Sequence, residues 1–409
     1  MKNWFAAGCW LVAGVAWAGF DEGMAAYKTQ DYATALREWS VLAEQGQPAA
    51  QAWLGWLYLN SQGVGLDNDQ ALVWFQHAAA QGDALGEQRL ADMYAQGKGV
   101  SRDYPQAASW YRKAAEQGNV AAAYALGHMY AEAQGVHQSF PLAAEWYRKA
   151  ADQGLPPAQY QLGLLYAGGK GLPQSDKDAM DWFAKAAAAG NAEAQFDLAA
   201  CYLRGSAVPA DPAQAADWTR RAAEQGHVEA QAQLARFYAQ GQGLQQDFSE
   251  AAKWYRRAAE QGQAQAQFNL AMLYAQGRGV PRDKTQTLAW YEKAAAQDYT
   301  PALFNLGQMY RLGLGVPRDD VKAAMWLRKA AARGDLGAQG NLSDMYAHGL
   351  GVPQDWSQAY LWASLAARNG DMSAVQSRDR AAARLDEHQL QNTQAAISAW
   401  LLAHPQSNQ

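Results

Sequence analysis

Histidine and cysteine are the residues of this sequence with the widest chemical repertoire, because both bind metals and both act in catalysis. The chain has 7 histidines and 2 cysteines. No two histidines have metal-site spacing such as His-Glu-x-x-His. We therefore expect no metal ion, no cofactor and no catalytic residues, and we interpret the histidines as solvent-facing. They are His77, His128, His137, His227, His348, His388 and His404.

Cys201 is the remaining candidate nucleophile, and its position in the sequence argues against that role. The positions that lie multiples of 36 residues from Cys201 hold only large apolar residues. A cysteine in such a column is expected to be buried and to behave as a small hydrophobic residue. The column comprises Leu57, Met93, Met129, Leu165, Phe237, Leu273, Met309 and Met345.

The same interval of 36 residues organises most of the chain. Leucine recurs at it from Leu54 to Leu342, and tyrosine and tryptophan recur in phase, which identifies an internal repeat. Nine full copies span residues 47–370. The tyrosines are Tyr58, Tyr94, Tyr130, Tyr166, Tyr202, Tyr238, Tyr274, Tyr310 and Tyr346. The tryptophans are Trp74, Trp110, Trp146, Trp182, Trp218, Trp254, Trp290, Trp326 and Trp362.

Each copy is expected to form two helices. In one copy, Ala266, Leu270, Leu273 and Tyr274 have the spacing i, i+4, i+7, i+8, which makes one apolar stripe on a helix. A glycine-rich turn follows, and an Asp or Ser then precedes the second helix, where its side-chain oxygen can accept free backbone N–H groups. We interpret these residues as caps: Asp67, Asp103, Ser139, Ser175, Asp211, Asp247, Asp283, Asp319 and Asp355.

The fold class follows from the stacking of these copies. One pair of short helices cannot bury its apolar stripe, whereas stacked copies can. Hairpins joined by such short turns place their two helices antiparallel. The pattern therefore predicts an all-α protein, a right-handed superhelical α/α solenoid of 36-residue helix-turn-helix repeats.

The repeat resembles the Sel-one-like repeat (SLR) family, which is related to the tetratricopeptide repeats. The copy from Ala84 to Gly118 carries nearly every position of the family pattern: Leu90, Tyr94, Gly97, Gly99, Val100, Asp103, Ala107, Trp110, Tyr111, Ala114, Ala115, Gln117 and Gly118. The resemblance implies a solenoid that binds proteins and organises complexes, often in the bacterial envelope. Some secreted members bridge each repeat with a cysteine pair, which this chain lacks.

Both ends of the repeat array are atypical, as capping units should be. Residues 19–46 contain the second helix of a truncated leading unit, with Asp31 one period before Asp67. Residues 371–409 are expected to form a C-terminal helical cap of two helices and a short tail. Asp386 and Gln389 have the spacing of a capping box before the second of these helices.

Residues 1–18 differ from the rest of the chain. Lys2 precedes a short uncharged apolar run, and Ala16 and Ala18 are the small residues that a signal peptidase reads. We expect a secretory signal peptide cleaved after Ala18, a periplasmic or secreted protein, and no stable membrane span after cleavage. Two alternatives remain, an uncleaved membrane anchor and a lipoprotein acylated at Cys9.

The net charge of −5 gives no support for nucleic-acid binding, which normally requires a basic surface. Pairs of basic residues recur in the last turns of the second helices, where cations complement the helix dipole. We interpret these pairs as part of a solvated outer face. They are Arg112-Lys113, Arg148-Lys149, Arg220-Arg221, Arg256-Arg257 and Arg328-Lys329.

Two columns of the first helix vary freely between copies and point away from the Leu/Tyr stripe. By resemblance to the family, first helices line the concave surface, so we expect these columns to contact a protein partner. Trp53 and Trp56 form the most distinctive pair, and packing against Trp39 under the leading unit is an equal alternative. The candidate partner-binding residues are Trp53, Trp56, Arg89, Asp92, His128, Gln161, Asp197, Arg236, Asn269, Met272, Asn305, Gln308, Asn341 and Asp344.

These observations favour a non-enzymatic protein-binding scaffold or adaptor of the bacterial cell envelope, which recognises an unidentified protein along a preformed groove. An inhibitor or immunity protein for an envelope toxin or enzyme is the first alternative. A cell-wall or β-lactam hydrolase is a weaker one, because it would need a nucleophile and a base at non-repeating positions.

Overall fold

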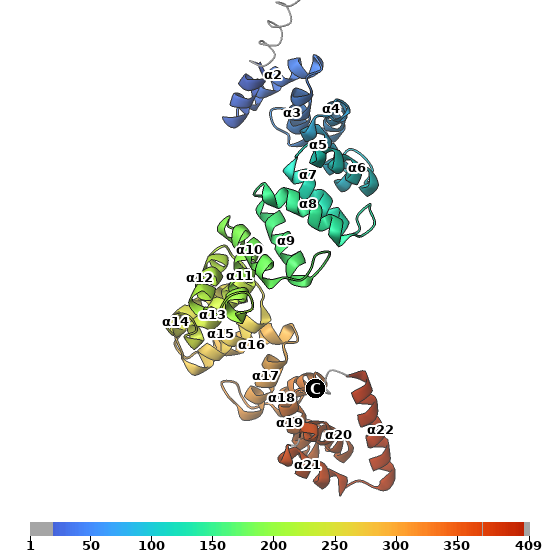
Figure 1. The fold of residues 1–409 in the computed structure, drawn as a ribbon. Helices are drawn as coiled ribbons and strands as arrows, with labels where there is room; N and C mark the ends of the chain where they lie inside the picture. The colour runs from blue at the N-terminus through green and yellow to red at the C-terminus, as the bar shows by residue number, and fades with distance from the viewer. Residues whose placement is uncertain (1–18, 370, 405–409) are drawn as a thin grey trace, which may run out of the picture. The chain divides into compact units, whose positions relative to one another are not determined.

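The computed structural model describes residues 19–369 and 371–404, and these residues form helices and turns with no β-strand (Figure 1). The predicted signal peptide, residues 1–18, lies outside this range. The chain divides into two compact units, and the boundary between Ala210 and Asp211 falls within the fifth repeat. Within each unit, consecutive helices pair into antiparallel hairpins that stack in chain order, which confirms the helical repeat solenoid.

The nine repeats, numbered 1 to 9, each contribute two helices. The first helices are α3 (Pro48–Leu59), α5 (Ala84–Gln96), α7 (Val120–Ala131), α9 (Pro156–Gly168), α11 (Ala192–Arg204), α13 (Val228–Gln240), α15 (Ala264–Gln276), α17 (Thr300–Leu312) and α19 (Leu336–His348). The second helices are α4 (Asn68–Ala80), α6 (Tyr104–Glu116), α8 (Phe140–Asp152), α10 (Asp176–Ala188), α12 (Pro212–Glu224), α14 (Phe248–Glu260), α16 (Lys284–Ala296), α18 (Asp320–Ala332) and α20 (Trp356–Ala366).

The predicted caps begin the second helices as expected. Asp283 Oδ1, for example, accepts hydrogen bonds from the backbone N–H groups of Thr285 at 2.9 Å and Gln286 at 3.0 Å. Side chains at all nine predicted positions accept backbone N–H groups in the same way. The interpretation of these residues as caps is confirmed, and their oxygens are engaged in positioning the backbone.

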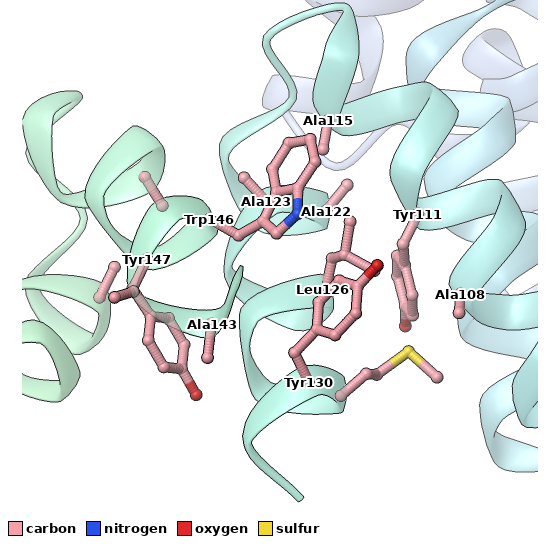
Figure 2. Packing of buried hydrophobic residues seen from close by; sticks show 14 of the residues in the cluster. Ala108, Tyr111, Ala115, Ala122, Ala123, Leu126, Tyr130, Ala143, Trp146 and Tyr147 are labelled. Carbon is pink, nitrogen blue, oxygen red and sulfur yellow. The ribbon is translucent and has the colours of Figure 1, made fainter. Parts of the chain in front are cut away.

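The core of each unit is the predicted apolar seam. The leucine column is buried from Leu54 to Leu342, and Cys201 is only 3% exposed, which confirms its place in the core. Burial also raises the pKa of the Cys201 thiol and so disfavours the nucleophilic thiolate. Figure 2 shows one stretch of the core, where alanines such as Ala115 and Ala123 leave room for the Trp146 indole. Small residues beside large rings allow close helix packing.

A network of glutamine side chains joins consecutive repeats, and the sequence reading did not predict it. The buried Gln267 donates from Nε2 to the carbonyl oxygen of Ala259 at 3.0 Å. Its own oxygen accepts from Nε2 of Gln297, at the end of the second helix of the same repeat, at 2.9 Å. The same two bonds form around Gln51 and Gln231. These bonds satisfy polar groups that would be costly to bury unpaired.

The second glycine of the turn between paired helices has a role beyond ending the first helix. At Gly279, where φ is +68°, an added Cβ would lie 2.1 Å from the carbonyl carbon of Phe248, the first residue of α14 in the preceding repeat. Gly351 approaches the carbonyl oxygen of Asp320 at 2.0 Å by the same measure. Glycine is therefore required here by close backbone packing as well as by its backbone conformation.

The basic pairs are exposed, apart from the half-buried Arg220, as expected of a solvated face, and the structure adds specific contacts. The first member reaches the tyrosine of the next first helix: Arg112 donates to the Tyr130 hydroxyl at 2.6 Å, and Arg256 donates to the Tyr274 hydroxyl. The second member lies over the tryptophan three residues earlier, as Lys113 does over Trp110 at 3.7 Å. Cation–π contacts favour this geometry.

The ends of the array are helical. Residues 19–28 are helical and precede α2 (Tyr32–Glu44), and the fully buried Trp39 of α2 joins them to repeat 1. After repeat 9 come η1 (Ala367–Asn369), α21 (Met372–Ala382) and α22 (Glu387–Ala403). The capping box of Asp386 and Gln389 at the start of α22 is confirmed. No helix within residues 19–369 and 371–404 has the length and apolar character of a membrane span.

Candidate functional site

The variable face consists of the fourteen candidate partner-binding residues named above. His128, Arg236 and Asp344 are exposed, and the other eleven are half-buried, so none of the fourteen belongs to the core. Side chains in this intermediate state are positioned by neighbours yet still reach solvent. They are therefore suited to contact a binding partner at low ordering cost.

At the leading end, packing against Trp39 is confirmed for Trp53, whereas Trp56 reaches the leading helices through Tyr27. The Trp53 ring lies 5.2 Å from the Trp39 ring and 5.1 Å from the Tyr27 ring, measured between centroids. Trp56 donates from its indole nitrogen to the Tyr27 hydroxyl at 2.9 Å. Both indoles are therefore half-buried between repeat 1 and the leading helices. Their binding to a partner stays a prediction.

Arg89 and Asp92 belong to a polar network beside these tryptophans, in which the buried Arg89 Nε makes no hydrogen bond. The Arg89 guanidinium lies 4.1 Å from the Trp56 ring centroid and pairs with Asp92 Oδ2 at 3.2 Å. Asp92 also accepts hydrogen bonds from Tyr111 at 2.6 Å and from Gln88 at 2.7 Å. Burial raises the pKa of Asp92, although these donors oppose the rise. A small cavity of about 90 Å³ lies against Arg89 and Trp56.

Other members of the variable face bond to side chains or to the backbone within the chain. Asp197 accepts from the Tyr160 hydroxyl at 2.9 Å, and Arg236 donates to Gln233 at 2.6 Å. Asn341 donates to the carbonyl of Gly337 at 2.6 Å. Asp197 lies in the first compact unit, and Arg236 and Asn341 lie in the second. Within the described part of the chain, no three His, Cys, Asp or Glu side chains gather as a metal site would require.

Asn305 and Gln308 line a larger cavity, of about 360 Å³, between α16, α17 and their adjoining turns. Asn305 donates from Nδ2 to the Tyr291 hydroxyl at 3.0 Å, and Gln308 Oε1 accepts from Arg311 Nε at 2.9 Å. The sequence reading missed the residues that join them in this cavity. The remaining lining residues are Ala275, Arg282, Lys284, Thr287, Tyr291, Met309, Gly313, Leu314 and Gly315.

A signal for this cavity is present in the sequence. The first position of the second helix holds Tyr104, Phe140, Phe248 or Trp356 in four repeats, and in repeat 7 it holds Lys284. A comparison of this column between copies therefore distinguishes repeat 7.

The fold and the variable face together define a helical-repeat solenoid of the protein-interaction type. Matches to the Sel1 repeat family cover nine segments. They are residues 48–83, 84–119, 120–155, 156–191, 192–227, 228–263, 264–299, 300–335 and 337–371. The chain therefore belongs to the Sel1 repeat family, as the sequence pattern indicated.

Solved structures agree with this assignment. A protective antigen of uropathogenic Escherichia coli strains, which displays the SLR fold, is 35% identical with a TM-score of 0.84, covering 97% of this chain and 86% of its own. A Sel1 repeat protein from Oxalobacter formigenes is 34% identical with a TM-score of 0.60, covering 80% of this chain and 92% of its own. No curated protein matches the chain.

Proposed function

We propose that this chain is a non-enzymatic scaffold that is exported to the bacterial cell envelope and binds a protein partner along the variable face. The proposal rests on the contrast between repeat positions that keep the same residue type and the two positions that vary. Leucine, tyrosine, tryptophan and the caps are used by the architecture, whereas no two repeats carry the same pair of residues in the two variable columns, and the residues of the variable face are half-buried or exposed. Within each unit, stacked hairpins present such residues without a large ordering cost on binding.

The predicted signal peptide supports export, and the E. coli relative is described as a protective antigen, with which a location outside the cytoplasm agrees. Mass spectrometry of the protein from its native envelope tests this part. We expect a chain that begins at Gly19 without a lipid. A lipid on Cys9 or a retained apolar run would instead make the protein a lipoprotein or an anchored protein.

The binding function is tested by affinity purification from the native envelope after cross-linking. We expect a protein partner with the wild-type chain, loss of that partner with Asn269→Arg/Met272→Arg, and its retention with Lys253→Glu on the exposed side of α14. Equal recovery with all three chains would contradict the assignment to the variable face. The absence of any specific protein from the wild-type sample would contradict the scaffold itself.

An adaptor and an inhibitor are separated by what the captured partner does. If it is a toxin or an enzyme, its activity is measured with and without this chain. Loss of activity on binding identifies an inhibitor or immunity protein. Unchanged activity, with further proteins recruited to the same complex, identifies an adaptor.

A further inference from the structure

The cavity between repeats 7 and 8 has an unusual charge arrangement. Its lining residues include the cations Arg282 and Lys284 and no carboxylate. Both cations are exposed, and neither makes an ion pair within residues 19–369 and 371–404. The intervening Asp283 uses its side chain to cap α16. Two neighbouring positive charges without an anionic partner repel each other.

Residues equivalent to Arg282 in other repeats do have partners. Arg318 forms two hydrogen bonds to Asp320, at 3.0 Å and 2.8 Å. Arg102 lies over the Tyr104 ring, with 5.6 Å between its guanidinium carbon and the ring centroid. The equivalent glutamines Gln138, Gln246 and Gln354 donate to backbone carbonyl groups. The residue two positions after the arginine is Tyr104 in repeat 2 and Asp320 in repeat 8, whereas in repeat 7 it is Lys284.

Lys284 is itself in an unfavourable position. It is the first residue of α16, where the helix dipole disfavours a cation. In repeat 6 the equivalent residue is Phe248, and the cation Arg278 from the following turn lies over its ring at 5.4 Å. At the equivalent positions one repeat later, the charged and apolar residues are reversed. Lys284 replaces the ring of Phe248, and Leu314, which is 55% exposed, replaces the cation Arg278. A local rule broken without a compensating contact is typical of a functional position.

The two amides of the cavity are each half used. Asn305 donates from Nδ2 to the Tyr291 hydroxyl, and its Oδ1 makes no hydrogen bond within the described residues. Gln308 accepts through Oε1 from Arg311, and its Nε2 donates to no described group. One acceptor and one donor therefore remain beside an apolar wall that includes Leu314 and Met309. A peptide group offers the complementary N–H and carbonyl.

We infer that this cavity binds a carboxylate carried by an extended peptide segment. Arg282 and Lys284 donate to the carboxylate, Asn305 and Gln308 bind the adjoining peptide group, and Leu314 contacts an apolar side chain. The carboxylate belongs either to an acidic side chain or to a chain terminus, since both offer the same two oxygens. This inference rests on the proposed protein-binding function and names one recognition site within it.

The test uses the full chain and three fluorescein-labelled hexapeptides of alanine and leucine, measured by fluorescence anisotropy. The first peptide carries one glutamate and an amidated end, the second has a free end and no glutamate, and the third has neither acid. We expect the first or the second to bind at least about tenfold more tightly than the third, which also identifies the source of the carboxylate. Equal affinities, or no binding at millimolar peptide, would overturn the inference.

The matched variant is Arg282→Gln/Lys284→Phe, which reproduces Gln246 and Phe248 of repeat 6 and should fold. We expect it to weaken binding of the acidic peptide about tenfold or more. Lys98→Gln/Arg102→Gln removes the same charge from repeat 2 and should leave the affinity unchanged. An equal loss in both variants would show general charge attraction and would contradict a site.

Failure of this inference is distinguishable from failure of the proposed function. If the wild-type chain captures its envelope partner but no acidic peptide binds, the carboxylate site is wrong and the scaffold stands. If no partner is captured, the scaffold itself is contradicted, whatever the peptides do. Circular dichroism of both variants confirms that any loss of binding occurs in a folded protein.

Discussion

Arg89 in repeat 2 and the cations of repeat 7 illustrate two ways of placing charge on the same scaffold. Arg89 stacks on Trp56 and pairs with Asp92, which in turn accepts from Tyr111, so both charges have partners within the chain, and in this sense the network is closed. Arg282 and Lys284 line a cavity without a carboxylate and with unused amide groups. The difference indicates that the first network stabilises the fold, whereas the second is arranged for something outside the chain.

The largest expected effect comes from breaking the closed network. Asp92→Ala leaves Tyr111, Gln88 and Arg89 without their common acceptor, and we expect a loss of about 2–4 kcal/mol in the free energy of unfolding. Urea denaturation followed by circular dichroism measures it. The control is Asp344→Ala, at the equivalent position of repeat 9, where the side chain is exposed and the change should stay within about 0.5 kcal/mol. Equal losses would contradict a special role for the network.

A smaller, pH-dependent effect follows from the raised pKa of Asp92. The folded state keeps the Asp92 proton to a higher pH than the unfolded state, in which the pKa of this carboxyl is near 3.8. Between the two pKa values the folded state therefore binds more protons than the unfolded state. Stability contributed by the protonated form is therefore present below about pH 3.8 and is lost as pH rises through the folded pKa. Relative to Asp92→Asn, the wild-type chain should lose stability across this window. Denaturation at a series of pH values measures it, and the opposite slope would contradict the burial argument.

Closing the open arrangement should stabilise the protein. Arg282→Gln/Lys284→Phe removes two like charges, relieves the cation at the start of α16 and places an apolar ring beside Gly315. We expect a gain of about 0.5–1 kcal/mol in the free energy of unfolding, of the kind that consensus substitutions produce. Thermal denaturation detects it. A destabilised variant would mean that the two cations serve the fold and would remove the contrast with repeat 2.

The smallest effect concerns salt. Repulsion between exposed charges is screened as ionic strength rises. The stability difference between the wild-type chain and Arg282→Gln/Lys284→Phe should therefore narrow between low and high sodium chloride. Thermal denaturation at both concentrations provides the comparison. A difference that is independent of salt would assign the gain to packing of the new ring alone.

Much of the fold was predictable because the architecture repeats. Nine in-phase copies of Leu, Tyr and Trp identify the hairpin, and each cap is recognisable from its place before an amphipathic segment. Bonds between repeats were harder to anticipate. The bond from Arg112 to Tyr130 joins residues whose proximity depends on the angle between hairpins, which column identities do not specify. For this reason the contacts of the basic pairs with tyrosine and tryptophan were not predicted, although their exposure was.

The variable face was predictable only as a set of positions. Its columns were recognised because they vary between repeats, whereas the burial and the bonds of each side chain depend on neighbours from other helices. Trp56 is held by Tyr27, and Asn305 by Tyr291, and both partners lie outside the variable columns. Arg282 and Lys284, the cations of the cavity between repeats 7 and 8, also lie outside the variable columns, so this cavity was not predicted.

The central claim is that the partner lies on the variable face, and site-specific photo-cross-linking in the native envelope tests it most directly. A photoreactive amino acid is placed at Gln161 or Asn269 on that face, and at Glu145 or Lys253 on the exposed side of the second helices. We predict one cross-linked partner from Gln161 and Asn269 and none from Glu145 and Lys253. Cross-links from the second helices alone would contradict the account.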